Sequence, residues 1–266
     1  SNSCFVFLIL FNPYHCEAHI NLGFSLEALG ELQEAKKCYE KAIKINPKYA
    51  DAYKNIGEIF KLFGELKKAI KSYQKAIEIN PNHAEAYNNL GNAFSEMEDY
   101  QRAKTFYQKA IEINPNHANA WLILAQLAER QNQNNQAIQA YQRALRANSN
   151  LLEAHYALGF LFQAQDQSQQ AAEHFKQVIR LDSKHAEAHL NLGVLYANLE
   201  KLDQAEKEYQ SAISLNPKLV EAYYNLGVFY EFYRKDTGRA LAQYRKYTEL
   251  GGKDKRVRNL LKKTSQ

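Results

Sequence analysis

Apolar and small residues recur along the chain with a period of 34 residues, and within each period they lie three and four positions apart. Spacings of three and four mark one face of an α-helix. In residues 50–83 two such stretches flank Gly64, a residue suited to a left-handed helix stop. Each period therefore predicts two helices joined by a short turn. Because one pair cannot bury all of its apolar surface, successive pairs are expected to stack.

The dipeptide Asn-Pro closes most periods, because proline cannot continue the second helix. Two closing positions without proline stay in register, at Asn148-Ser149 and Asp182-Ser183. The proline-containing closures are Asn12-Pro13, Asn46-Pro47, Asn80-Pro81, Asn114-Pro115 and Asn216-Pro217.

The residues inside each period resemble the tetratricopeptide repeat, in which an aromatic, Leu-Gly, an aromatic, alanine, an aromatic and proline recur in that order. One copy reads Tyr87, Leu90-Gly91, Phe94, Ala103, Tyr107 and Pro115. The resemblance implies an all-α fold, a right-handed superhelical α-solenoid of antiparallel helix pairs. The seven predicted repeats are residues 16–49, 50–83, 84–117, 118–151, 152–185, 186–219 and an irregular 220–252.

Both ends extend this array. Residues 1–15 align with 35–49 at the same offset of 34, so they are interpreted as the second helix of a truncated repeat. Its apolar run would need cover, either from a lost partner helix or from another copy of the protein. Residues 253–266 predict a basic capping helix and tail, in which Val257, Leu260 and Leu261 cover the last apolar face.

The net charge of +5 comes from one segment, because residues 251–266 hold six basic residues and one acidic residue. The remaining chain is neutral, so no nucleic-acid partner is expected. No stretch approaches the roughly 18–20 apolar residues that cross a bilayer, so no membrane insertion is expected. Cys4, Cys16 and Cys38 form no CxxC pair. Together these features favour a reducing compartment, and we expect a cytoplasmic location.

The sequence contains no constellation of catalytic residues and no nucleotide-binding glycine motif. His19, His155 and His189 occupy a position that holds Tyr or Trp in other repeats, so they are interpreted as packing residues. A spacing of 34 residues places them in different layers, too far apart for one metal ion. We therefore expect no enzymatic activity, no metal and no cofactor.

The family resemblance implies that first helices line a groove that binds peptides or partner proteins. Two residues before the repeat's glycine, asparagine recurs although it is a mediocre helix former. Its amide could pair with the backbone of an extended peptide; alternatively, it makes local hydrogen bonds. Ile123 and Ala157 interrupt the series, which comprises Asn21, Asn55, Asn89, Asn191 and Asn225.

Apolar residues one helical turn apart follow the same face in the C-terminal half. They predict an anchor for an amphipathic helix or an apolar peptide segment. They could instead belong to the core or mediate self-association. These residues are Tyr156, Phe160, Leu190, Val194, Tyr224, Val228 and Phe232.

The favoured function is thus a non-catalytic protein–protein interaction scaffold. Two alternatives stay open. The chain could be the substrate-recognition region of a larger enzyme, such as an O-linked glycosyltransferase. It could also be a structural assembly protein that forms a homo-oligomer through the groove or the apolar N-terminal helix.

Overall fold

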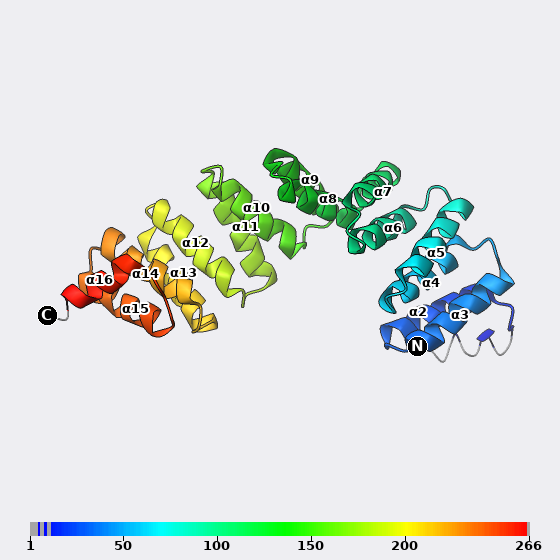
Figure 1. Cartoon of the computed structure of the whole chain (residues 1–266), viewed down its shortest axis with the longest axis horizontal. Coiled ribbons are helices and arrows are strands. Elements are labelled where there is room, and N and C mark those ends of the chain that lie inside the picture. The colour runs from blue at the N-terminus through cyan, green and yellow to red at the C-terminus, as the bar shows by residue number, and fades with distance from the viewer. Residues whose placement is uncertain (1–4, 6–7, 10–11, 265–266) are drawn as a thin grey trace. The chain divides into compact units, whose positions relative to one another are not determined.

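The computed structural model describes residues 5, 8–9 and 12–264, and within this part of the chain it is all α-helical. Successive helices form antiparallel pairs (Figure 1). The chain divides into two compact units, Ser1–Ala147 and Asn148–Gln266. The repeat pattern carries no signal of this division, which falls in the loop between α9 and α10.

The first unit contains four helix pairs: α2 (Cys16–Ala28) with α3 (Leu32–Ile45), α4 (Ala50–Leu62) with α5 (Leu66–Ile79), α6 (Ala84–Glu96) with α7 (Tyr100–Ile113), and α8 (Ala118–Arg130) with α9 (Asn134–Ala147). The second unit contains α10 (Leu152–Gln163) with α11 (Ser168–Leu181), α12 (Ala186–Asn198) with α13 (Leu202–Leu215), and α14 (Val220–Val228), which continues as the π-helix η1 (Phe229–Tyr233), with α15 (Thr237–Glu249). The helix α16 (Lys255–Lys263) follows.

In six of the seven described pairs, an aromatic ring of the second helix lies on a glycine of the first; in the α8–α9 pair, Ala125 takes the glycine's position. A Cβ atom added to Gly57 would lie only 2.6 Å from Cε1 of Tyr73, a side chain that is fully buried. Gly159 and Phe175 repeat this contact in the second unit, with a closest distance of 2.7 Å. The glycine is therefore required by close helix approach, and the ring fills the space that a side chain would occupy.

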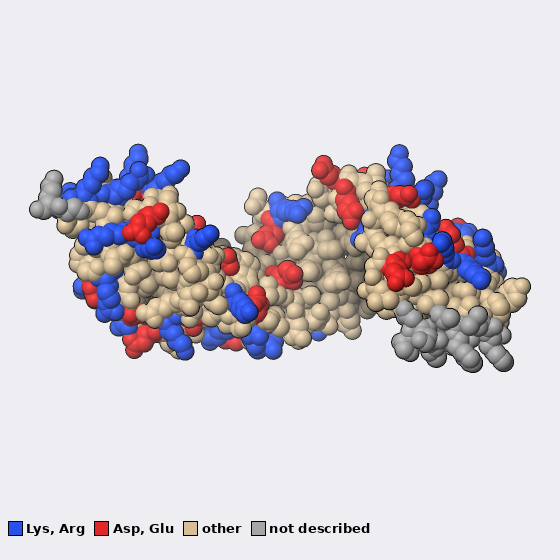
Figure 2. Space-filling model, turned by 90° about the horizontal axis from the view of Figure 1, so that it is seen from below, with Lys and Arg blue, Asp and Glu red and all other residues tan. Residues whose placement is uncertain are grey.

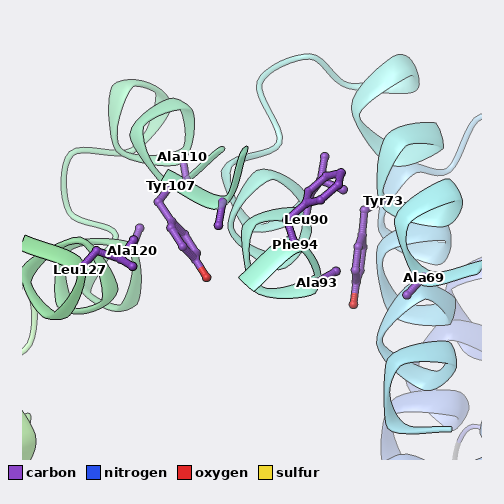
Figure 3. Packing of buried hydrophobic residues seen from close by; sticks show 10 residues of the cluster. Ala69, Tyr73, Leu90, Ala93, Phe94, Tyr107, Ala110, Ala120 and Leu127 are labelled. Atoms are coloured by element: carbon purple, nitrogen blue, oxygen red, sulfur yellow. The ribbon is translucent and has the colours of Figure 1, made fainter. Parts of the chain in front are cut away.

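Neighbouring pairs share one continuous core. Figure 3 shows Tyr73 of α5 facing Leu90 and Phe94 of α6, with Tyr107 of α7 beyond them. Leu127 of α8 belongs to the same buried cluster. From α5 to α8, the apolar residues of one helix pair are thus covered by the neighbouring pair, as the repeat pattern predicts.

The turn inside each of the first six pairs is a Schellman motif. After α4, the Glu65 amide donates to the Phe60 carbonyl and the Gly64 amide to the Lys61 carbonyl, both at 2.8 Å. Gly64 has a φ of 75°, in the left-handed region that glycine adopts without steric cost. Other residues take this conformation at the equivalent turns: Glu98, Asn132, Asp166 and Glu200.

The loop that closes each repeat depends on its Asn or Asp more than on its proline. The Asn46 side-chain oxygen accepts from the Lys48 amide at 3.0 Å. Where proline is absent, Asp182 accepts from the Lys184 amide at the same distance. Such Asx turns hold the chain between pairs, which explains why the two repeats without proline keep their register.

The last pair differs from the others, as its irregular sequence predicts. Its additional residue is accommodated as η1, after which the Arg234 amide donates to the Phe229 carbonyl five residues earlier, at 3.1 Å. Helix α16 buries Val257 completely, and the Arg256 guanidinium lies 2.9 Å from Glu231. Figure 2 shows basic side chains gathered beside the C-terminal end of the chain. This arrangement is the predicted basic capping helix.

Most of the predicted helix within residues 1–15 lies outside the described residues, including Cys4, Val6, Phe7, Leu10 and Phe11. Of its apolar run, Phe5, Leu8 and Ile9 are described and are helical. The proposal that this segment docks on another copy therefore stays a prediction.

We predict that one substitution will have different costs at two glycines of the same repeat. Gly64→Asn should lower the free energy of unfolding by less than about 1 kcal/mol, because asparagine tolerates left-handed backbone and no atom lies within 4 Å of the added Cβ. Gly57→Asn should cost about 3 kcal/mol, because the new side chain displaces Tyr73. Urea unfolding followed by circular dichroism measures both. Equal losses would show that close helix approach is not what requires Gly57.

Candidate functional site

The predicted apolar residues of the second unit lie on α10, α12, α14 and η1 and differ widely in exposure. Phe160 is 40% exposed and Phe232 is 59% exposed, whereas Leu190 is only 6% exposed. Tyr156, Val194, Tyr224 and Val228 are half-buried. Phe160 and Phe232 are therefore the candidate contacts, and Leu190 packs beneath the surface.

Phe160 is held by a frame of aromatic rings. The Tyr156 ring meets it edge-on, with ring centres 4.9 Å apart. Phe175, the ring that lies on Gly159, supports Phe160 from α11 at 5.3 Å and Tyr156 at 5.8 Å. The exposed ring is consequently preorganised, so binding through it would cost little side-chain entropy.

A second aromatic group surrounds Tyr224. Its ring lies 5.3 Å from Tyr247 of α15. Both tyrosines line a pocket of about 430 Å³, together with Asn225 of the predicted asparagine series, Glu221 and Asp254. Here an asparagine side chain and aromatic rings border the same pocket, a combination suited to a polar segment with an apolar side chain.

Two other asparagines of the series make hydrogen bonds within the protein. Asn89 Nδ2 donates to Glu58 Oε1 at 2.6 Å, and Lys54 lies 3.7 Å from the same carboxylate oxygen. Asn191 is hydrogen-bonded to Tyr156. The pKa of Tyr156 is raised, chiefly by burial and also by the charge of Glu187, and the hydrogen bond to Asn191 partly offsets this. The local hydrogen-bonding alternative thus applies to Asn89 and Asn191. Asn55 is buried and Asn21 exposed, and peptide binding by the series stays a prediction.

Tyrosine hydroxyls form a feature that the reasoning from sequence missed. The Tyr39 hydroxyl donates to Glu27 at 2.9 Å, and the Tyr244 hydroxyl reaches Glu231 at 2.5 Å. Glu27 and Glu231 each follow the glycine that the tyrosine ring covers by four residues. This spacing in the sequence could have revealed the tyrosine–glutamate hydrogen bond. The buried Tyr73 hydroxyl has no hydrogen-bond partner among the described residues.

Family comparisons agree with this architecture. A family profile described as the cilia and flagella-associated protein 70 C-terminal domain, a tetratricopeptide repeat domain, matches residues 13–216. The chain belongs to this tetratricopeptide repeat family. A second profile, described as tetratricopeptide repeat, matches residues 195–255. Among curated proteins, no relative matches.

Several solved structures are similar to this tetratricopeptide repeat chain. YrrB, a TPR protein with an unusual peptide-binding site, is 29% identical, with a TM-score of 0.58 over 69% of this chain and 95% of its own. The pilF protein of Pseudomonas aeruginosa is 22% identical, with a TM-score of 0.67 over 83% of this chain and 97% of its own. A TPR repeat-containing protein from Cytophaga hutchinsonii is 16% identical, with a TM-score of 0.68 over 90% of this chain and 98% of its own. The last two establish the fold alone.

His19 occupies the repeat position that holds Trp121 in the fourth repeat, and both side chains reach the carbonyl of a repeat-closing proline. His19 Nε2 lies 3.0 Å from the Pro13 carbonyl, and Trp121 Nε1, at the equivalent position, donates to the Pro115 carbonyl at 2.9 Å. Among the described residues, no three His, Cys, Asp or Glu side chains are placed to hold a metal ion. In the same part of the chain, no helix has the length and apolar character needed to cross a membrane.

His155 and His189 occupy the same position in successive tetratricopeptide repeats, but their partners across the helix pair differ. His155 Nδ1 lies 3.0 Å from His174 Nδ1; since His155 Nε2 donates to the Ser149 carbonyl, His174 must donate between the rings. Burial, and secondarily His155, lower the pKa of His174 to about 4. One repeat later, Glu208 takes the place of His174, and its hydrogen bond raises the pKa of His189.

We predict opposite pH dependences for these two kinds of pair. As pH falls below about 6.5, the unfolded chain binds protons that the native His155–His174 pair does not. Because of this pair, the free energy of unfolding of the protein should fall by about 1–2 kcal/mol as pH falls toward 4. His174→Glu recreates the His189–Glu208 pair; its stabilisation should be present below about pH 6.5 and lost as pH rises through the raised pKa of His155.

Urea unfolding at several pH values between about 4.5 and 8 compares the wild type with His174→Glu. The difference in free energy of unfolding should favour the variant increasingly as pH falls. Parallel pH profiles for the two proteins would contradict the electrostatic assignment of this pair.

Proposed function

We propose that this protein is a non-catalytic scaffold that binds a peptide or amphipathic helical segment of a partner protein. The tetratricopeptide repeat fold is typical of protein–protein interaction scaffolds. The observation that carries the proposal is the exposed Phe160 ring on α10, the first helix of its pair. This ring is fixed by Tyr156 of the same helix and by Phe175 of α11. A large, rigid aromatic side chain on a surface is the usual centre of a binding hot spot.

The likeness to YrrB supports peptide binding, because that protein has a peptide-binding site and covers most of this chain. The ligand chemistry follows from the side chains near Phe160. Val194 and Val228, in the same repeat position of the next two pairs, are half-buried and apolar. A partner segment with apolar residues at helical spacing would match these side chains better than an acidic or basic peptide.

Neither alternative has a comparable observation in its favour. If the chain were the substrate-recognition region of a larger enzyme, it would use the same surface for binding. That hypothesis differs from the scaffold hypothesis only in requiring a further, catalytic domain. Self-association through Phe160 and Phe232 would make the mass in solution depend on concentration, which light scattering over a dilution series detects. We favour a different partner chain because the apolar side chains are flanked by half-buried polar groups such as Asn191 and Asn225, a mixture typical of non-obligate interfaces.

We predict that Phe160→Glu removes partner binding and leaves the fold intact, because this side chain is already 40% exposed. Loss of an aromatic hot spot should weaken binding at least about thirtyfold. The matched control is Phe24→Glu, because Phe24 occupies the same repeat position in α2 and is 67% exposed. The control should keep full binding.

Affinity capture with the three proteins, followed by calorimetry with the identified partner segment, measures the effect. Circular dichroism must show equal helicity. Equal capture by wild type and Phe160→Glu would refute the assignment, and a concentration-dependent mass abolished by Phe160→Glu would favour self-association.

A further inference from the structure

The first unit contains a pocket of about 390 Å³ that the repeat pattern does not predict. It lies between α7, α8 and α9, with Ile111, Trp121 and Leu124 among the apolar residues that line it. Its volume falls in the range of sites that bind small ligands or single large side chains.

The pocket exists because two side chains that fill this place in other repeats are small here. In the preceding repeat, Phe106 of α7 stacks on Phe94 of α6 with ring centres 5.4 Å apart, and it lies 6.4 Å from Tyr87. In the following repeat, Phe162 stacks on His174 with ring centres 5.4 Å apart, and His155 contacts the His174 ring. The corresponding three residues of the α8–α9 pair are Trp121, Ala128 and Ala140, and all three line the pocket.

The rim of the pocket is basic. Lys104 of α7 and Arg143 of α9 line it, and no acidic side chain does. Neither cation is paired with a carboxylate among the described residues, whereas Lys109, the other lysine of α7, lies 2.7 Å from Glu112. The remaining polar lining is amide, from Gln108, Gln133, Gln136 and Gln139.

This pocket is separate from the proposed peptide surface. Ile123 and Gln126, which belong to the groove side of α8, are turned by about 200° and about 140° from Trp121 around the helix axis. The Phe160 surface, in addition, lies in the other unit. A ligand of this pocket therefore constitutes a second interaction, and its test does not depend on the first.

We propose that this pocket binds a segment of a partner protein in which an aromatic side chain is flanked by Asp or Glu. The aromatic ring would occupy the space that Phe94 and Phe106 fill in the preceding repeat. The flanking carboxylates would pair with Lys104 and Arg143, and the glutamine amides can donate to and accept from the backbone of the segment. The combination of an apolar floor and a cationic rim favours this occupant over a neutral apolar segment.

The single tryptophan of the chain makes the test direct, because Trp121 lines the pocket and its emission reports on occupancy. The probe is the peptide acetyl-Asp-Glu-Phe-Glu-Asp-amide, titrated into the full chain at low salt. One control peptide replaces Phe by Ala, and another replaces the acids by Asn and Gln. A third arm uses phenylacetate, which carries the same chemistry without a peptide backbone.

We expect a saturable change in Trp121 emission with the probe peptide. The affinity should be about tenfold lower for either control peptide and for phenylacetate. Binding should weaken as salt is added. Lys104→Gln combined with Arg143→Gln should weaken binding about tenfold and reduce its salt dependence.

Ala140→Phe tests the cavity itself, because Phe106 is accommodated at the equivalent position one repeat earlier. It should fill the pocket and reduce binding at least about tenfold. The control variant Gln126→Ala, on the other side of α8, should bind like the wild type. If Ala140→Phe does not fold, the double charge variant decides alone.

Three results would overturn the proposal. The first is the absence of a saturable emission change up to millimolar probe peptide. The second is equal binding by wild type and the double charge variant. The third is phenylacetate binding as tightly as the peptide, which would identify a pocket for small aromatic anions instead.

Discussion

The contact between an aromatic ring on the second helix and a glycine on the first helix, found in six of the seven described pairs, is the constraint on which the structure depends. At Gly57 the Tyr73 ring takes the place that a side chain would occupy. The two helices therefore approach closely, and Ala69 and Ala76 are buried beside the ring because larger residues would separate the pair. Repetition of this contact every 34 residues gives successive pairs similar geometry, so that one buried cluster extends from α5 to α8.

The same contact links the core to the surface. A tyrosine ring on glycine places its hydroxyl beyond the first helix, where Tyr39 meets Glu27 and fixes the position of a carboxylate. Where phenylalanine replaces tyrosine, at Phe175, the ring instead supports the exposed Phe160. The choice between tyrosine and phenylalanine in a buried position thus alters the chemistry of the candidate binding surface above it.

Departures from the repeat produce the features that distinguish one pair from the next. Ala128 and Ala140 leave a pocket where Phe94 and Phe106 fill the preceding repeat. Burial lowers the pKa of His155, which has no glutamate beside it, whereas the hydrogen bond to Glu208 raises the pKa of His189. In each case the fold persists because the glycine–aromatic contact, or its Ala125–Tyr141 counterpart in the α8–α9 pair, is retained while the side chains around it vary.

The helices, their pairing, the glycine turns and the basic capping helix could be predicted from the sequence, because these depend on residue spacing along one chain. The same spacing placed the apolar residues of α10, α12 and α14 in two repeat positions, one helical turn apart. Three features became evident in the folded protein alone: Phe160 is exposed while Leu190 is buried, Asn89 is bound to Glu58, and the chain divides after Ala147. The physical reason is that periodicity identifies the face of a helix, whereas burial and hydrogen bonding depend on which side chains of neighbouring helices meet that face.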